Sequence, residues 1–357
     1  MPEAKSIPAV SAGLLDSGTL RTAREKSLEM RQYLDEILSR EVGKYASPDT
    51  SLVVFGSLAR GEWTSGSDLD WTYLIDGGAK STHLQITQDI QRVFKEKGLA
   101  EPGPTGTFGN MAFSHDIIHQ IGGQNDTNKN TTQRILLLLE STPIGERREA
   151  YDRVIRAVID RYLEEDTHLL TRDLKNYRVP RFLLNDIVRF WRTMAVDFAN
   201  KQRDRAGKRL GLRNAKLRMS RKLIFASGLL VCFSSNLDSD LQNKISTDTN
   251  DVRFQLGNHI RDYVRLSPLE ILERFIKRYN IPDPVAKELF DSYTKFLRVL
   301  NDETSRKALD ELRSENSGTD PTFKQIREIS EAFKGALDHV FFENRQIARL
   351  TREYGVF

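Results

Sequence analysis

The sequence predicts an α+β protein in which a small mixed-sheet domain precedes a larger all-helical domain. Three observations favour this fold class. Two short apolar runs, one at Leu52–Phe55 and one ending at Ile75, flank a turn rich in glycine and serine, as paired strands do. Strand-like and helix-like segments alternate as far as about residue 144. Beyond residue 145, apolar residues recur at spacings of three and four, which indicates helices.

Local patterns place the elements of the first part. Apolar spacing predicts a helix that Ser47-Pro48-Asp49 ends, and an amphipathic helix that Gly98 closes. A serine or threonine is a favoured first residue of a helix, so Ser114 and Thr131 or Thr132 are expected helix starts. In chain order, the expected elements are a helix at 19–45, strands at 52–55 and 68–75, a helix at 82–97, a strand at 108–113, a short helix from 114 and a helix up to 139.

The second part is predicted to be a helical bundle, because short breaks containing proline or glycine separate long segments of helical periodicity. The expected helices are 146–165, 180–201, 213–234, 251–264, 267–279, 283–301, 303–315 and 321–354, the last broken near Glu343. We therefore expect three units. They are an N-terminal helical segment (1–50) packed on the first domain, the mixed-sheet domain (51–144) and the bundle (145–357).

The composition indicates a globular protein of a reducing compartment. Of 357 residues, 39% are hydrophobic and 29% charged, which excludes a disordered chain. The lone cysteine, Cys232, lies in an apolar run without a charged or imidazole neighbour, so we expect it to pack rather than react. The longest apolar run is shorter than the ~20 residues that span a bilayer, and no convincing signal peptide begins the chain. We expect a cytoplasmic protein with no membrane partner.

The stretch LVVFGSLARGEWTSGSDLDWTYLID, residues 52–76, carries the clearest chemical signal. Gly56 permits a sharp turn and close approach to a phosphate, and Ser57 offers a hydroxyl and a backbone N–H to the terminal phosphates. Arg60 is available to neutralise phosphate charge. Asp68 and Asp70 fall on one face of a strand, where two carboxylates need a compensating cation. The pattern predicts two Mg²⁺ ions, with Mn²⁺ as an alternative, carrying a nucleoside triphosphate.

The string FGSLARGEWTSGSDLDWTYLI resembles the signature of nucleotidyltransferases related to DNA polymerase β, in which Gly-Ser precedes Asp-x-Asp by about ten residues. The additional Arg60-Gly61-Glu62 and Ser67-Asp68 most resemble the branch of the PII-protein uridylyltransferases. The close resemblance covers about 25 residues. It implies a small mixed sheet flanked by helices, Mg²⁺ dependence and nucleotide transfer, with Ser67 among the nucleotide-binding residues. It does not identify the acceptor.

One departure from the family concerns the third carboxylate, which a later strand usually supplies. The expected strand, Phe108–Phe113, contains no acidic residue. Asp116 lies just past it and is our candidate, while Asp126 in the next loop is an alternative. Asp116 also suits the N-terminal end of a helix, where a negative charge is favoured.

Two further motifs resemble metal sites and are interpreted otherwise. His115-Asp116-Ile117-Ile118-His119 has the histidine spacing of a zinc helix, but it lacks the glutamate and a third ligand. The loop that starts at Asp126 has Thr131 in place of the glycine and Leu137 in place of the bidentate acid of a calcium loop. We expect neither metal.

Positive charge is concentrated in residues 201–222, with ten Lys or Arg and one acid, Asp204. This segment is either a solvated face or a basic wall of the active-site cleft that binds the triphosphate or RNA. From it and the preceding helix we select Arg189 and Lys222 as nucleotide-binding residues. Asn185 and Asp186, close to an apolar face, are interpreted as core polar residues, with ribose or base binding as the alternative.

The leading hypothesis is a Mg²⁺-dependent nucleotidyltransferase that transfers a nucleoside monophosphate and releases pyrophosphate. Its partners would be a nucleoside triphosphate and an acceptor such as RNA or a protein. One alternative is a catalytically silent nucleotide- or RNA-binding module. Another is a toxin or phage-defence effector that nucleotidylates RNA. The sequence does not specify the base, the acceptor or the oligomeric state.

Overall fold

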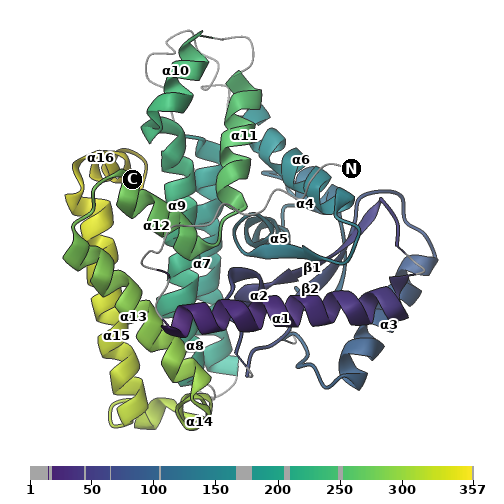
Figure 1. Ribbon diagram of the computed structural model, residues 1–357, viewed down its shortest axis with the longest axis horizontal. Helices are drawn as coiled ribbons and strands as arrows, with labels where there is room; N and C mark the ends of the chain where they lie inside the picture. Colours follow the sequence, from purple (N-terminus) through teal and green to yellow (C-terminus); the bar gives the residue numbers. More distant parts are fainter. Residues whose placement is uncertain are drawn as a thin grey trace.

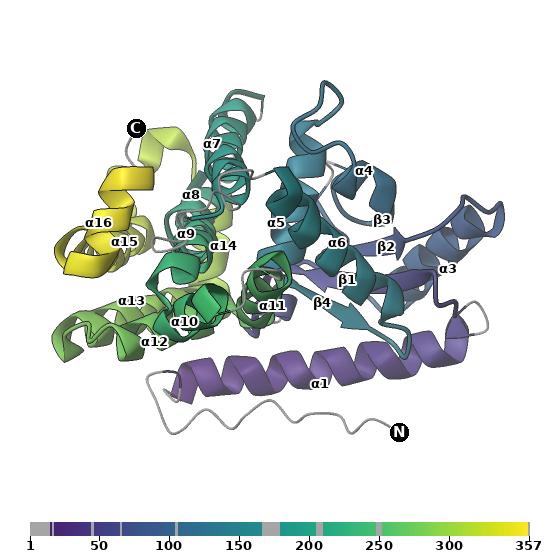
Figure 2. The ribbon, with the colours of Figure 1, turned by 90° about the horizontal axis from the view of Figure 1, so that it is seen from above.

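The computed structural model describes Leu15 and residues 18–43, 46–64, 66–103, 106–165, 179–204, 210–247 and 252–355, except the side chains of 165, 201–204, 246 and 247. A small sheet with its covering helices lies beside a bundle of longer helices (Figures 1 and 2). This arrangement confirms the predicted α+β fold class. Within the described ranges, no helix combines the length and apolar content that crossing a bilayer requires.

The sheet contains four short strands in the order β3-β2-β1-β4. The strands are β1 (Thr50–Phe55), β2 (Trp71–Ile75), β3 (Asn110–Phe113) and β4 (Ser141–Ile144). The central strand β1 is antiparallel to both β2 and β4, whereas β2 and β3 are parallel. The mixed sheet is therefore centred on the strand that leads into the Gly-Ser turn.

Alternate residues of β1 enter two different cores, because successive side chains of a strand point to opposite faces of the sheet. Leu52 and Val54 pack with the helices α1 (Gly18–Glu41) and α3 (Thr82–Glu96). Val53 and Phe55 join the larger core, which extends through the bundle. All six residues of β1 are buried, so both faces of the sheet are covered.

The remaining helices cover the second face of the sheet and build the bundle. On the second face these are α4 (Ser114–Ile118), α5 (Asn128–Leu139) and α6 (Glu149–Glu165). The short helix α2 (Gly56–Arg60) instead packs Leu58 into the core of the first face. The bundle contains α7 (Arg181–Asp204), α8 (Leu210–Lys216), the π turn η5 (Leu217–Arg221), α9 (Lys222–Leu237), α10 (Ser239–Thr247), α11 (Val252–Val264), α12 (Pro268–Arg278), α13 (Asp283–Asn301), α14 (Glu303–Glu311), the 3₁₀ turn η7 (Ser314–Asn316), α15 (Pro321–Asp338), the π turn η8 (His339–Glu343) and α16 (Arg345–Tyr354).

The strand β4 was not predicted from the sequence. It is only four residues long and contains Pro143, which cannot donate a backbone hydrogen bond. Proline is tolerated here because β4 lies at the edge of the sheet, where Pro143 pairs with Val53. This strand sets the position of the residue before it, Glu140.

Other boundaries differ from expectation in small ways. The strand β2 begins at Trp71, so Asp68 and Asp70 precede it rather than lying within it. Helix α5 begins earlier than predicted, because Thr127 accepts a hydrogen bond from the Asn130 backbone N–H and caps it. The expected helix at 303–315 ends at Glu311, and α10 was not expected. The predicted break near Glu343 is confirmed by η8 and α16.

The boundaries proposed at residues 50 and 144 stay predictions, but the packing connects the units closely. Helix α6, beyond the second boundary, packs on β1 and β2. Helix α1 runs along the sheet part and reaches α13 of the bundle (Figure 2). One buried core contains residues from β1, α6 and α16. The cleft between sheet and bundle therefore has walls that share a common core.

Candidate functional site

The Gly-Ser turn joins β1 to the five-residue helix α2. Gly56 has φ +69°, a left-handed conformation that favours glycine. Arg31 of α1 donates hydrogen bonds to the carbonyl oxygens of Leu58 (2.6 Å) and Ala59 (2.7 Å), at the carboxyl end of α2. The Leu58 carbonyl oxygen also accepts from the Gly61 N–H at 3.4 Å. Because so short a helix leaves its last carbonyl oxygens with few backbone partners, Arg31 stabilises the turn from outside the cleft.

The two aspartates lie beside this turn. The Phe55 backbone N–H donates to the Asp70 carbonyl oxygen at 2.9 Å, which holds the aspartate segment against the end of β1. Asp68 is exposed and Asp70 half-buried, while Leu69 between them is buried. Gly56, Ser57, Asp68 and Asp70 line one cavity of about 340 Å³. The structure thus brings together the four residues that the sequence pattern selected first.

Glu140 is one of three further acidic residues, with Glu62 and Asp197, that line this cavity. It lies at the carboxyl end of α5, immediately before β4, and its neighbour Ser141 is paired with Phe55. Burial raises the pKa of Asp70 to about 7, with further increases from the negative charges of Glu140 and Asp68. Strand β3, where the family resemblance placed the third acid, has none. Sequence reasoning missed Glu140 because β4 was not recognised.

Arg60 has carboxylate partners in place of the predicted phosphate. Its guanidinium pairs with Glu62 at 2.7 Å and with Glu140, and its side chain is 9% exposed. The Tyr293 hydroxyl of α13 donates to Glu62 at 2.9 Å. Burial is outweighed by the two glutamates, so the pKa of Arg60 lies well above its usual value. This charged cluster connects α2, β4 and the bundle beneath the cavity.

The other predicted site residues are dispersed. Ser67 lines the cavity, but its hydroxyl is engaged with Thr64. Asp116 is exposed on α4 and does not line the cavity. Arg189 and Lys222 do not line it either. Lys222 is half-buried, and its nearest charges include Arg218 and Glu331. The structure therefore does not bring Asp116, Arg189 or Lys222 to the aspartates.

Two cations that were not selected from the sequence do face the aspartates. Lys216 and Arg221, on either side of η5, both line the cavity. Burial lowers the pKa of each, opposed by the charges of Asp68 and Asp70 for Lys216 and of Asp197, Glu140 and Asp70 for Arg221. Among the described residues, neither has a carboxylate oxygen within 4 Å. Of the basic segment, the side chains of 201–209 lie outside the described part.

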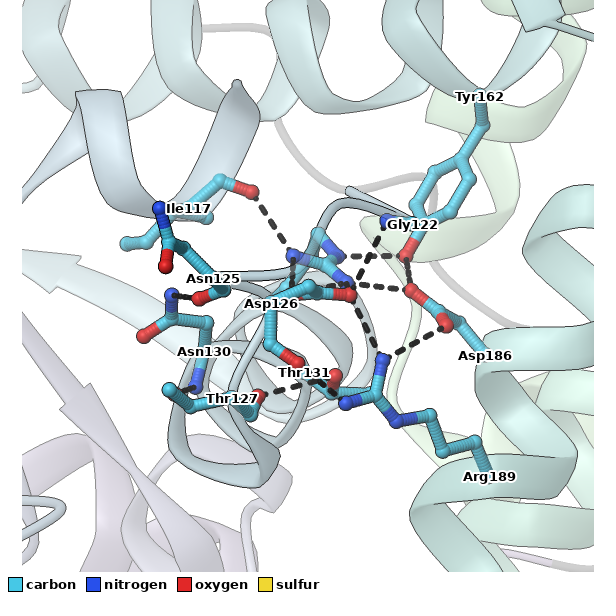
Figure 3. Close-up of polar contacts among 11 residues, drawn as sticks. Ile117, Gly122, Asn125, Asp126, Thr127, Asn130, Thr131, Tyr162, Asp186 and Arg189 are labelled. Carbon is cyan, nitrogen blue, oxygen red and sulfur yellow. Dashed lines mark hydrogen bonds and ion pairs between the residues drawn. The ribbon is translucent and has the colours of Figure 1, made fainter. Parts of the chain in front are cut away.

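Arg189 belongs to a buried ion-pair network centred on Arg134 (Figure 3). Arg134 is fully buried and contacts Asp126 at 3.0 Å, Asp186 at 2.5 Å and the Tyr162 hydroxyl at 2.6 Å. Arg189 donates to Asp126 at 2.7 Å. The positive charge and hydrogen bonds of Arg134 outweigh burial and lower the pKa of Asp126. Asp126 is therefore committed to arginines, which agrees with rejecting a calcium loop.

This network joins helices on both sides of the cleft. Its members come from the loop before α5, from α5, from α6 and from α7. Asp186 proves to be a satisfied buried polar residue, as the preferred interpretation of the sequence had it. The same interpretation was wrong for Asn185, which is exposed. Next to the network, a groove lined by Asn128, Asn185, Arg189 and Arg192 continues from the main cavity along α7, sharing Asn128, Thr193 and Asp197 with it.

The histidine pair is a surface feature. His115 and His119 are exposed, with ring centroids 5.1 Å apart. Over the parts of the chain that the structure describes, no three His, Cys, Asp or Glu side chains gather closely enough to hold a metal ion by themselves. Cys232 is fully buried in the core of the bundle, and burial raises the pKa of its thiol, in keeping with a packing role.

Comparison with known families identifies the region that contains the Gly-Ser turn and the aspartates. Residues 30–100 match the family model described as a nucleotidyltransferase domain, which belongs to the DNA polymerase β-like superfamily. The match covers the second half of α1, strands β1 and β2, and α3. It supports nucleotidyl transfer in general. None of the curated proteins compared with the chain matches it.

Proposed function

We propose that this protein is a Mg²⁺-dependent nucleotidyltransferase that transfers a nucleoside monophosphate from a nucleoside triphosphate to an acceptor. The observation that carries the proposal is the single cavity in which the Gly56–Ser57 turn and the two aspartates meet Lys216 and Arg221. These two cations form no ion pair with any residue that the structure describes. A nucleoside triphosphate is a polyanion that binds together with Mg²⁺. The aspartates would therefore bind the metal ion, and the cations would bind the phosphates.

The donor set fits Mg²⁺ rather than a metal held only by protein. Mg²⁺ is usually bound through one or two carboxylates, with the remaining positions filled by substrate phosphates and water. Asp68 and Asp70 would supply these carboxylates. Burial is the largest cause of the raised pKa of Asp70, and the negative charges of Glu140 and Asp68 add to it, a repulsion that a divalent cation relieves. The absence of a three-ligand cluster among the described side chains agrees with this ligand count.

The proposed reaction is an in-line displacement at the α-phosphorus. An acceptor hydroxyl oxygen forms a bond to that phosphorus, the bond to the bridging oxygen of the β-phosphate breaks, and pyrophosphate leaves. Bound Mg²⁺ would neutralise the developing charge on the phosphate oxygens. We assign Glu140 as the carboxylate that accepts the hydroxyl proton. Its Oε2 is paired with Arg60, and its Oε1 has no hydrogen-bond partner among the described residues.

The acceptor would reach the α-phosphorus through the groove along α7. This groove is continuous with the main cavity, and its lining includes Arg192, an exposed arginine, and the amides of Asn128 and Asn185. Such a lining accommodates a polar acceptor and leaves the choice between RNA and protein open. The kinship with PII-protein uridylyltransferases and the toxin or phage-defence role likewise remain proposals.

The experiment follows the α-phosphate. The protein is incubated with cell lysate and each α-labelled nucleoside triphosphate, and RNA, protein and small molecules are separated. Label in one fraction is expected to depend on Mg²⁺ or Mn²⁺ and to fall at least about 100-fold in Asp68→Asn and Asp70→Asn. Asp291→Asn, an exposed aspartate of α13 outside the cavity, is the matched control. Tight triphosphate binding without any labelled acceptor would instead establish the silent nucleotide-binding module.

A further inference from the structure

Lys216 and Arg221 should not share a face of a regular helix. They are five residues apart, and five residues of an α-helix make about 1.4 turns. Side chains at this spacing point about 140° away from each other. Both nevertheless line the cavity that contains Asp68 and Asp70.

The π turn η5 (Leu217–Arg221) resolves this conflict. Helix α8 ends at Lys216, η5 follows without a break, and α9 begins at Lys222. In a π turn the hydrogen bond runs between residues i and i+5, so the turn holds more residues than an α-helical turn and side chains five apart point in more similar directions. The wider turn thus brings Lys216 and Arg221 to one side of an otherwise continuous helix. Single π turns inside α-helices are rare and frequent at functional sites.

The other two cations of residues 216–222, Arg218 and Lys222, lie near helix α15 and not in the cavity. Arg218 pairs with Glu331 at 3.0 Å and contacts Ser330, both on α15. Lys222 is also close to Glu331, and neither it nor Arg218 lines the cavity. Two cations therefore face α15, where an acid is present. The other two face the cleft and have no ion pair within the described ranges of the chain. Keeping partly buried cations unpaired is costly, so an anionic ligand is expected opposite them.

We propose that η5 builds a polyphosphate subsite across the cleft from the Gly56–Ser57 turn, with Lys216 and Arg221 as its two cations. The subsite deepens the proposed function and rests on it. Two separate cations suit a ligand with several adjacent charges, whereas a single phosphate engages one of them. The π turn is the positioning device: it sets the spacing at which both cations meet one ligand.

The test measures binding of inorganic tripolyphosphate and orthophosphate to the full chain by calorimetry, with Mg²⁺ present. Lys216→Gln and Arg221→Gln are each expected to weaken tripolyphosphate binding about 10- to 100-fold, the range for a hydrogen bond to a charged group. Orthophosphate binding should change much less. Arg218→Gln, which loses only the contacts to α15, is the matched control and should bind as the unaltered protein does.

Two further variants examine the geometry. Lys222→Gln tests the competing assignment from the sequence: if it weakens binding more than Lys216→Gln and Arg221→Gln do, the proposal is overturned. Leu217→Lys in the Lys216→Gln background moves the cation one residue along the chain, to a position in η5 that does not line the cavity. It is expected not to restore binding, and full restoration would refute the role of the π turn. Thermal melts of each variant confirm that it is folded.

Failure of the subsite and failure of the proposed function give different results. Unchanged tripolyphosphate binding in both glutamine variants, together with label transfer that Asp70→Asn abolishes, overturns the subsite alone. Loss of tripolyphosphate binding in those variants without any labelled acceptor supports the subsite and refutes the transferase.

Discussion

Replacing Gly56 by alanine tests whether the turn and the aspartates act as one unit. At φ +69° a β-carbon costs about 1–2 kcal/mol, because it crowds the backbone in the left-handed conformation. The added carbon would also lie 3.3 Å from Asp70 Oδ2, closer than an ordinary contact. Asp70 must then shift by a few tenths of an ångström, and small displacements of catalytic groups reduce rates strongly.

Gly98 provides the control. It follows α3 with φ +67°, and nothing lies within 4 Å of the position a β-carbon would take. Gly56→Ala and Gly98→Ala should therefore lose a similar free energy of unfolding, about 1–2 kcal/mol in urea denaturation followed by circular dichroism. Only Gly56→Ala should reduce Mg²⁺-dependent nucleotide transfer, by about tenfold or more. Equal activity in the two variants would show that the turn does not position Asp70.

Two further predictions follow from buried titratable groups. Arg134→Met should lower the free energy of unfolding by about 3–5 kcal/mol, because it leaves Asp126 and Asp186 buried without their partner. The control is Arg153→Met, which removes a half-exposed ion pair and should cost less than about 1 kcal/mol. Equal melting temperatures for the two variants would contradict this prediction. Burial lowers the pKa of His259 to about 4, so the unfolded chain binds this proton more tightly and the protein should lose up to about 3 kcal/mol of stability as the pH falls from 6.5 to 4. In His259→Gln, the denaturation midpoint should no longer fall between pH 6.5 and 4 because of this group. A midpoint that falls with pH as steeply as in the unaltered protein would argue against the role of His259.

Local signals were sufficient for the turn and the aspartate pair. Gly56 and Ser57 directly follow a strand, and residues two apart near a strand share a side, so Asp68 and Asp70 were placed from spacing alone. Helix positions in the bundle followed from apolar periodicity, with boundary errors of a few residues. The family match to residues 30–100 lies over the same local pattern.

The rest of the cavity depends on contacts between distant segments. Glu140 reaches the site because β4 pairs with β1. This pairing could not be predicted from the sequence, because β4 is only four residues long and contains a proline. Arg60 resembled a phosphate ligand in sequence, but two glutamates that pack beside it take up its charge. Asp116 follows β3 as the pattern required, yet α4 turns its side chain to the solvent.

The sequence by itself thus determined the α+β class, the Gly56–Ser57 turn and the aspartate pair, because each depends on neighbours within a few residues. Only the tertiary structure decided which carboxylate and which cations complete the site. Helical periodicity assumes 3.6 residues per turn, so it separates Lys216 from Arg221 and cannot foresee a π turn that aligns them. Their shared face is a property of that turn, packed against the cleft, and not of their spacing in the chain.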